Sequence, residues 1–169
     1  CNVGCVGNRI GGNKPLRCSI NPDIINNEEY RKHKINKPCN VVVVGAGTAG
    51  LEAACTAAEV GCNVTLLEKE EHVGGLSVEI SKIPAKKRLA DFPNYLKHRA
   101  SKLDNLTIKT GVDVTVDMIK SYDPQLVVNA TGSVPLLPPI NGLHDNLGKE
   151  DAAVYSIKDM INNLDNYPE

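Results

Sequence analysis

The alternation of apolar and polar positions is clearest in the stretch from residue 40 to residue 68. Four consecutive valines, Val41–Val44, form a short apolar run that is typical of a strand buried on both faces. A glycine-rich turn follows, and the alanine-rich segment Leu51–Val60 predicts a helix. Gly61 is suited to end that helix, because the residue after a helix often adopts the left-handed conformation. Val64–Leu67 then predicts a second buried strand.

Weaker patterns predict further elements after residue 68. Residues 83–103 carry apolar side chains at helical spacing and predict a helix that Pro93 should kink or restart. Leu106–Lys109 predicts a third strand, and the alternation of Val112, Val114 and Val116 predicts a short, half-buried strand.

The last third of the chain continues the strand and helix pattern. Gln125–Ala130 predicts another buried strand, and the proline-rich segment that follows Gly132 predicts a stiff exit. Val154–Leu164 predicts a helix with Ser156 as its N-cap. The elements together predict an α/β fold, a doubly wound, Rossmann-like domain with a parallel sheet.

The turn after the first strand has the glycine spacing of a dinucleotide-binding site. Gly45 allows the tight turn, Gly47 lets a pyrophosphate approach the backbone, and Gly50 lets the helix pack closely on the strand. The N-terminus of the helix offers unpaired N–H groups to the phosphates. Glu68, 23 residues after Gly45, can accept hydrogen bonds from the adenosine ribose and disfavours a 2′-phosphate. The alternative is a glycine-rich turn in an ordinary α/β protein.

The first 38 residues differ from the rest of the chain. Cys1, Cys5 and Cys18 have the spacing C-x3-C-x12-C, and the glycines among them predict a loop rather than a helix. Such a loop can hold a metal cluster through its thiolates, although three unrelated thiols in a loop are the alternative. The charged segment 26–37 is expected to be a linker or a surface segment. We therefore divide the chain into residues 1–38, a cysteine loop and linker, and residues 39–169, a dinucleotide-binding domain.

The other three cysteines have no spacing typical of metal ligands. Cys39 precedes the first strand, Cys55 lies inside the predicted helix, and Cys62 opens the second strand. We expect all three to be small, buried apolar residues.

Composition narrows the function. The net charge of −1 gives no indication of a nucleic-acid partner, and no apolar run approaches the roughly 20 residues of a membrane span. Six cysteines in a domain of this kind indicate a reducing compartment, so we expect a cytoplasmic protein. The chain starts with Cys1 rather than Met, and we expect a processed product or a piece of a longer protein.

The order of these motifs resembles one enzyme family. The cysteine loop, the segment VVVVGAGTAGLEAA and the later NATGSVPLLPPINGL are similar to the C-terminal half of NADH:flavin oxidoreductases of the old yellow enzyme class, which include 2,4-dienoyl-CoA reductase, 2-enoate reductase, the bile-acid-inducible reductases and trimethylamine dehydrogenase. The resemblance implies a parent with an FMN-containing barrel, a four-cysteine [4Fe-4S] cluster, an FAD-binding domain and an NAD(P)H-binding domain. This chain is similar to the end of the cluster loop and the first part of the FAD domain.

The resemblance also implies roles for particular residues. Cys1, Cys5 and Cys18 match three of the four cluster ligands, and the fourth cysteine would lie outside the chain. Val114 is implied to contact the adenine through its backbone, with a plain strand residue as the alternative. The residues implied to bind FAD, or ADP in its place, are Gly45, Ala46, Gly47, Thr48, Ala49, Gly50, Glu68, Lys69, Gly75, Leu76, Val114, Ala130, Thr131 and Gly132.

The implied function is electron transfer within a parent that reduces activated C=C bonds. The partners are then the dinucleotide and the remaining domains of the parent, with no nucleic acid and no membrane. No residue of this chain is implied to be catalytic, and the chain alone is expected to be inactive. Two alternatives remain: a non-redox ADP-binding module, as in trimethylamine dehydrogenase, and a reductase domain like the small subunit of glutamate synthase.

Overall fold

The structure is a computed structural model that describes residues 4–18, 21, 24, 32–134, 136–149, 152 and 154–163. The chain divides into two units, residues 1–37 and residues 38–169. Each is described by itself.

The first unit contains helical backbone where a loop was expected. Helix α1 (Gly4–Val6) continues into the π-helical turn η1 (Gly7–Gly11). The N–H of Gly12 donates to the carbonyl oxygen of Gly7 at 2.9 Å and closes this turn. The prediction of a loop was therefore wrong for residues 4–11. Glycine costs only about 1 kcal/mol in a helix, and local backbone hydrogen bonds outweigh that preference here.

The second unit is built on a parallel sheet of four strands in the order β3-β2-β1-β4. The strands are β1 (Asn40–Val44), β2 (Asn63–Leu67), β3 (Leu106–Lys109) and β4 (Leu126–Asn129). Val41 pairs with Val64 on one side and with Leu126 on the other. Val41, Val42 and Val43 are at most 1% exposed, as expected for a central strand. The predicted α/β fold with a parallel sheet is confirmed.

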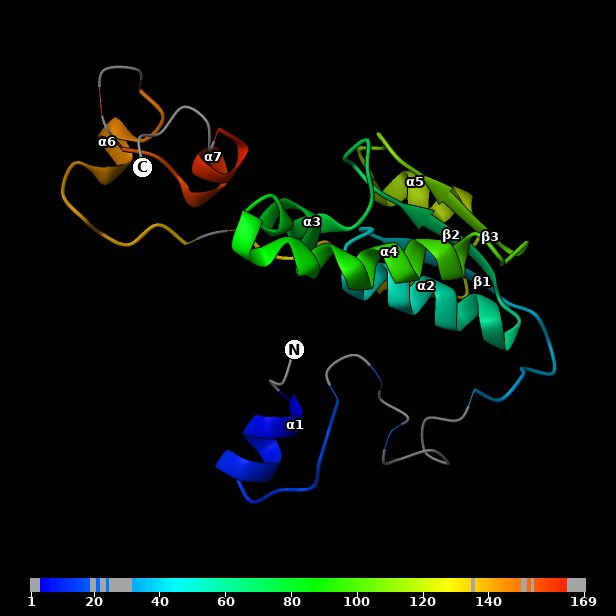
Figure 1. Cartoon of the computed structure of the whole chain (residues 1–169). Helices are drawn as coiled ribbons and strands as arrows, with labels where there is room; N and C mark the ends of the chain where they lie inside the picture. Colours follow the sequence, from blue (N-terminus) through cyan, green and yellow to red (C-terminus); the bar gives the residue numbers. More distant parts are fainter. Residues whose placement is uncertain are drawn as a thin grey trace. The chain divides into compact units, whose positions relative to one another are not determined.

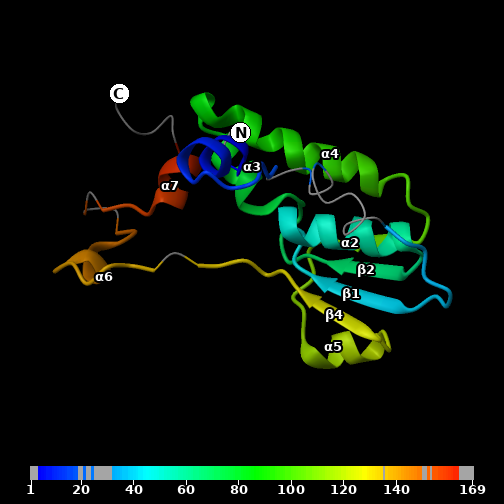
Figure 2. The same ribbon diagram turned by 90° about the horizontal axis from the view of Figure 1, so that it is seen from below.

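Two helices cover one face of the sheet. Helix α2 (Thr48–Val60) contacts all four strands, and α4 (Asp91–Ala100) packs on α2. The core between them combines strand side chains with Leu51 of α2 and Leu96 of α4. Helix α5 (Val116–Ser121) lies on the opposite face (Figures 1 and 2).

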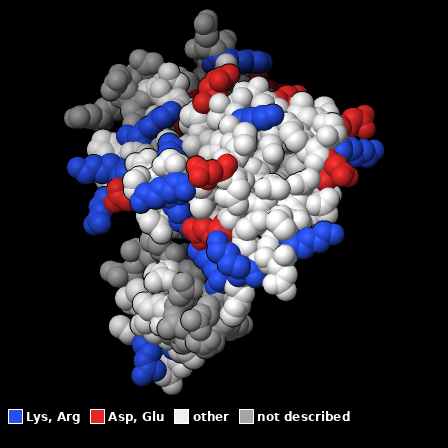
Figure 3. Space-filling view, turned by 90° about the vertical axis from the view of Figure 1, so that its right-hand side faces the viewer, with Lys and Arg blue, Asp and Glu red and all other residues white. Residues whose placement is uncertain are grey.

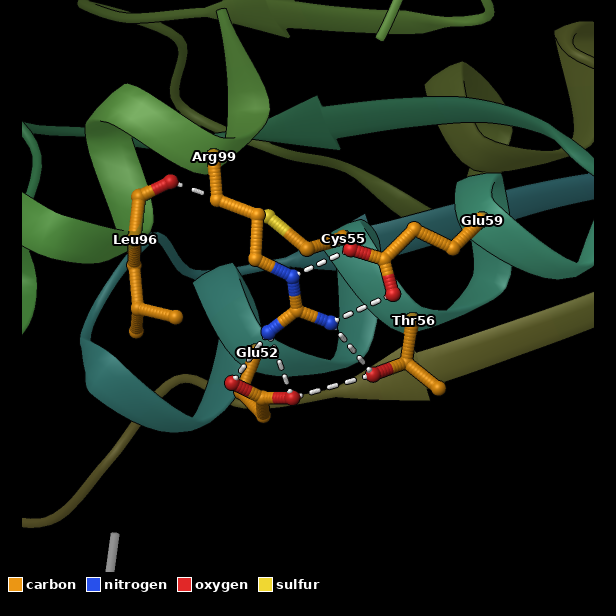
Figure 4. Close-up of polar contacts among 6 residues, drawn as sticks. All are labelled: Glu52, Cys55, Thr56, Glu59, Leu96 and Arg99. Atoms are coloured by element: carbon orange, nitrogen blue, oxygen red, sulfur yellow. Dashed lines mark hydrogen bonds and ion pairs between the residues drawn. The ribbon is translucent and has the colours of Figure 1, made fainter. Parts of the chain in front are cut away.

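An ion-pair cluster joins the two covering helices (Figure 4). Arg99 of α4 lies between Glu52 and Glu59 of α2 and donates from Nη1 to both Glu52 oxygens at 2.8 Å and from Nη2 to Glu59 Oε2 at 2.8 Å. Hydrogen bonds from Arg99 to Glu59, and then to Glu52, hold the pKa of the guanidinium above its usual range despite partial burial. Thr56 accepts a further bond from Nη2 at 3.2 Å. The cluster fixes α4 against α2 above the core.

The amino edge of the sheet is closed by side chains. Gly61 ends α2 with φ 110°, which confirms its predicted role. Asn105, just before β3, donates from its amide nitrogen to the carbonyl oxygens of Ala58 at 2.8 Å and Cys62 at 2.7 Å. These bonds tie the segment before β3 to the last turn of α2 and to the residue that precedes β2.

The segment between β2 and β4 differs from the prediction at three places. A short helix, α3 (Gly75–Ser81), was missed. The segment predicted as a helix over residues 83–103 begins as a 3₁₀-helix, η3 (Pro84–Ala90), which was not expected. A new helix, α4, then starts with Pro93 in its first turn, so the predicted restart is confirmed. Residues 112–115 form no strand, since Thr115 caps α5 by accepting from Met118 N at 3.2 Å.

The chain after β4 adds two short helices, α6 (Leu143–Asn146) and α7 (Ile157–Asn162). Ser156 caps α7, as predicted, and it also exchanges hydrogen bonds with Asp159. Helix α7 packs on α3, where Lys82 Nζ donates to Asn162 Oδ1 at 2.5 Å.

Charges of both signs are interspersed around a broad uncharged area on the face drawn in Figure 3. Among the residues that the structure describes, no helix combines the length and the apolar character that crossing a membrane requires.

Candidate functional site

Three loops meet at the carboxyl edge of the sheet. The turn after β1 is tied to β2 by the bond from Gly45 N to Leu67 O, at 2.8 Å. The loop after β2 returns to this turn, where Gly74 N donates to Ala46 O at 2.8 Å. The segment after β4 begins with Ala130, whose N–H donates to Val44 O at 2.8 Å. The sequence places its predicted binding residues in these loops, and the structure brings the loops together.

Two of the predicted glycines are required by packing. Gly45 has φ 97°, and a Cβ there would overlap the carbonyl group of Ala130. A Cβ at Gly50 would overlap the carbonyl oxygen of Gly45. Gly45 therefore makes the turn and Gly50 lets α2 start against it, as the sequence predicted.

Gly47 is a glycine for a different reason. Its φ of −68° suits any residue, and within the described part of the chain no atom beyond its neighbours lies within 4 Å of where its Cβ would be. It is the N-cap of α2, a position where serine or aspartate would favour the helix more. Neither backbone strain nor packing requires glycine here, whereas a ligand lying on the turn would.

The start of α2 can bind an anion beside Gly47. The first helical residues are Thr48, Ala49 and Gly50, and their N–H groups have no partner within the helix. Leu51 N is the first to bond within the turn, to Gly47 O at 2.9 Å. The dipole of this 13-residue helix adds positive potential at the same end.

Glu68 has a structural role that sequence reasoning missed. It is 8% exposed, and its carboxylate accepts from Ala46 N at 2.6 Å and from Glu70 N at 3.0 Å. The charge therefore holds the glycine turn against the end of β2. A carboxylate offers about four acceptor sites, so two remain for ribose hydroxyls. The spacing from Gly45 located this residue, but the bond to Ala46 N depends on the fold.

The predicted residues in the loop after β2 differ in how close they lie to the glycine turn. Gly75 has φ 56°, and a Cβ there would lie 2.9 Å from Gly47 Cα, so this glycine permits the close approach of the two loops. Leu76, in the first turn of α3, has 65% of its surface exposed. The side chain of Lys69 points into solvent, with Nζ 3.9 Å from Glu70 Oε1.

Gly74 was not predicted as a site residue. Its φ is 118°, and a Cβ would overlap the side chain of Val78. The Gly-Gly pair gave a signal in the sequence, but the partner of the first glycine belongs to the helix that was missed.

The last predicted residues lie in the segments that follow the two outer strands, β3 and β4. Val114 is half-buried in the segment after β3, which is joined to Glu68 by the bond from Val112 N to Glu68 O at 2.8 Å. Thr131 is exposed, and its Oγ1 donates to Asn129 Oδ1 at 2.9 Å. Gly132 has φ 79° and is also exposed.

The predicted cluster ligands are described only in part. Cys5 lies in α1 and is half-buried, and Cys18 accepts from Asn21 N at 3.3 Å. Cys1 lies outside the described residues. Within the described ranges no three histidine, cysteine or acidic side chains form a metal-binding group, and the three-cysteine ligand set stays a prediction.

Comparison with known proteins gives a consistent result. Residues 9–91 and 40–164 match the model of the family described as pyridine nucleotide-disulphide oxidoreductase. The chain is 36% identical over 165 residues to an NADH oxidase of Thermoanaerobacter brockii, with 95% of the chain and 24% of that protein covered. It is 33% identical over 153 residues to a cinnamate reductase of Clostridium sporogenes, with 89% of the chain and 22% of that protein covered.

Among solved structures, a 2-naphthoyl-CoA reductase in complex with 2-naphthoyl-CoA superposes with a TM-score of 0.81. The sequences are 33% identical, and the match covers 87% of this chain and 22% of that one. The chain thus spans about a quarter of the length of the relatives it matches.

Proposed function

Because the chain belongs to the pyridine nucleotide-disulphide oxidoreductase family, we propose that it binds the ADP half of FAD within a flavin-dependent NAD(P)H oxidoreductase. The pyrophosphate lies on the turn from Gly45 to Gly50, at the start of α2. The ribose hydroxyls donate to Glu68. Val114 contacts the adenine, and Ala130, Thr131 and Gly132 lie over the dinucleotide.

The observation that carries this proposal is the environment of Gly47. Of the three motif glycines, Gly47 alone lies where the packing would accept a side chain, and yet the residue there is glycine. A bound pyrophosphate explains this, because a Cβ and its substituents would fill the space that the phosphate oxygens need. The alternative of a glycine-rich turn in an ordinary α/β protein accounts for Gly45 and Gly50 but leaves Gly47 unexplained.

The acidic residues after β2 set the choice of nucleotide. Glu68 is buried, and Glu70 and Glu71 follow it on the surface. A 2′-phosphate on the adenosine ribose would lie beside these carboxylates and be repelled. The site therefore prefers FAD and ADP to nucleotides that carry a 2′-phosphate.

The role in the parent rests on the relatives and on the resemblance. When bound, FAD would supply hydride and one-electron redox chemistry to the parent, in which NAD(P)H is the proposed reductant, and a [4Fe-4S] cluster and FMN are the further cofactors that the resemblance implies. Cys1, Cys5 and Cys18 are the proposed cluster ligands of this chain. The names NADH oxidase, cinnamate reductase and 2-naphthoyl-CoA reductase fit this class of reaction.

Titration of the chain with FAD and ADP tests the binding function. We expect saturable binding of FAD, with quenching of its flavin fluorescence, and competitive displacement by ADP because both occupy the same turn. Adenosine 2′,5′-bisphosphate should compete at least about 10-fold more weakly, since like charges face its 2′-phosphate.

The outcomes separate the alternatives. Binding of ADP together with exclusion of FAD would identify a non-redox ADP module. Absence of binding of both nucleotides to a chain with native circular dichroism would contradict the proposal.

A further inference from the structure

Two cysteines lie together at the amino edge of the sheet. Cys39 immediately precedes β1, and Cys62 immediately precedes β2. The ladder between these strands begins at the pair Asn40 and Asn63, so the cysteines are one position before it in the same register. Asn63 N donates to Cys39 O at 2.9 Å, which fixes the two backbones side by side.

The side chains of the two cysteines point to the same face. Side chains alternate along a strand, so Cys39 shares the face of Val41, and Cys62 shares that of Val64. Both valines belong to the core beneath α2, together with Cys62, and Cys39 packs against it. The two sulfur atoms lie 3.3 Å apart.

We propose that Cys39 and Cys62 are an oxidation-sensitive dithiol, which a peroxide converts to a disulfide that joins the two central strands. Adjacent strands are about 4.8 Å apart, within the roughly 4.4–6.8 Å between Cα atoms that a disulfide spans. The sulfurs need to approach by only about 1.3 Å to reach bonding distance. The sheet therefore holds both thiols near the geometry of the product.

The two thiols differ in a way that assigns their roles. Burial, and then the hydrogen bond to Cys39, raise the pKa of the Cys62 thiol to about 11. Cys62 is 6% exposed, whereas Cys39 is half-buried and can be reached from solvent. Cys39 is accordingly the thiol that meets the oxidant, and Cys62 is the thiol that resolves the product.

The reaction balances with one peroxide. The Cys39 thiolate attacks a peroxide oxygen, the O–O bond breaks, and hydroxide leaves to become water with the proton that Cys39 released. Cys62 sulfur then attacks the sulfur of the resulting Cys39 sulfenic acid. The second hydroxide leaves with the proton of Cys62 as water. Two thiols and one hydrogen peroxide thus give one disulfide and two waters.

The cross-link would close a loop that contains the whole first strand, the glycine turn and α2. It joins the amino ends of β1 and β2, while the glycine turn lies at their carboxyl ends. The oxidised chain should therefore be more stable and retain its nucleotide site.

Peptide mapping tests the proposal directly. The reduced chain is treated with hydrogen peroxide, alkylated, and cleaved without reductant by a protease that cuts after glutamate. Cuts after Glu52 and Glu59 place Cys39, Cys55 and Cys62 in three different peptides. We expect a linked pair of the Cys39 and Cys62 peptides, lighter than their sum by two hydrogen atoms and separated by dithiothreitol.

Matched variants define the result. Cys39→Ser and Cys62→Ala should each abolish the linked pair, whereas Cys55→Ala should retain it, because Cys55 Sγ lies 3.7 Å from Leu96 O, under α4. Peroxide should raise the melting temperature of the parent chain and of Cys55→Ala by roughly 5 °C or more, and not that of Cys39→Ser. The proposal is overturned if Cys39 and Cys62 are both found alkylated after peroxide treatment, or if either is linked instead to Cys1, Cys5 or Cys18. It is also overturned if the linked chain melts no higher than the reduced one.

Discussion

The amino edge and the carboxyl edge of the parallel sheet differ in how their residues are used. At the amino edge Asn105 donates to the carbonyl oxygens of Ala58, in the last turn of α2, and Cys62, and the side chains of Cys39 and Cys62 pack against each other. At the carboxyl edge Gly47 has no side chain, so the space above the turn is open. The buried carboxylate of Glu68 faces the same turn. The amino edge is filled by its own side chains, and the carboxyl edge keeps space and hydrogen-bonding capacity for a ligand. Changes at one edge should therefore alter stability alone, and changes at the other should alter binding.

The largest effect is expected inside the carboxyl edge, at Gly50. Gly50→Val would force a branched side chain into the carbonyl oxygen of Gly45 and separate α2 from the turn. We expect a loss of roughly 3 kcal/mol or more in the free energy of unfolding, measured by urea denaturation. Ala49→Val is the matched control, because Ala49 is exposed at the next position; equal losses in the two variants would show that helix propensity and not packing is responsible.

Glu68→Ala should weaken both binding and the turn. It removes the proposed acceptor for ribose hydroxyls and the two bonds from Ala46 N and Glu70 N. Charge-assisted bonds of this kind contribute about 1.5–3 kcal/mol, so affinity for ADP should fall roughly 10-fold or more in isothermal titration. Glu70→Gln, with its exposed side chain, should change affinity little. If Glu68→Ala binds ADP with the affinity of the parent chain, Glu68 has only a structural role.

Asn105→Ala tests the amino edge. It leaves the carbonyl oxygens of Ala58 and Cys62 without the side-chain donor and should lower the free energy of unfolding by about 1–2 kcal/mol. Affinity for ADP, measured below the unfolding transition, should stay unchanged. A loss of affinity in the folded variant would show that the two edges are coupled. It would contradict the claim that changes at the amino edge alter stability alone.

The smallest effect concerns Glu79 of α3 and depends on pH. Its pKa is held below its usual value, mainly by the hydrogen bond from Lys82 at 2.8 Å and further by His72. The contribution of the ionised Glu79 to the free energy of unfolding is present above the unfolded pKa of about 4.3. It is lost as the pH falls through the lower pKa of the folded protein. Glu79→Gln should cost less than about 1 kcal/mol at neutral pH. The difference from the parent should vanish in acid below both pKa values, and a constant difference would exclude this ion pair as its source.

The sequence predicted both strands of the first βαβ unit to within one residue, whereas α2 begins at Thr48, ahead of the predicted start at Leu51. The valine run, the three glycines, Gly61 and Glu68 are local signals, which can be recognised along the chain without knowledge of the strand order. The resemblance to NADH:flavin oxidoreductases is confirmed by the family match and by the relatives.

The rest depended on contacts between distant residues. The bond from Ala46 N to Glu68, the packing of Gly74 on Val78 and the sulfur contact of Cys39 with Cys62 all arise from the strand order. Cys39 was expected to be buried and is only half-buried. The valine alternation at residues 112–116 resembles a strand, but Gly111, with φ 67°, and the Thr115 cap convert it to a turn and a helix.

The affinity of Gly47→Val for ADP and FAD tests the central claim most directly. The new side chain meets open space in the folded protein, so the free energy of unfolding should change by less than about 1 kcal/mol. The proposed pyrophosphate site needs that same space, so equilibrium dialysis should show loss of binding of both nucleotides. Asn105→Ala, at the amino edge of the sheet, is the control that should still bind. A folded Gly47→Val chain that binds ADP and FAD with unchanged affinity would contradict the assignment of this turn as the dinucleotide site.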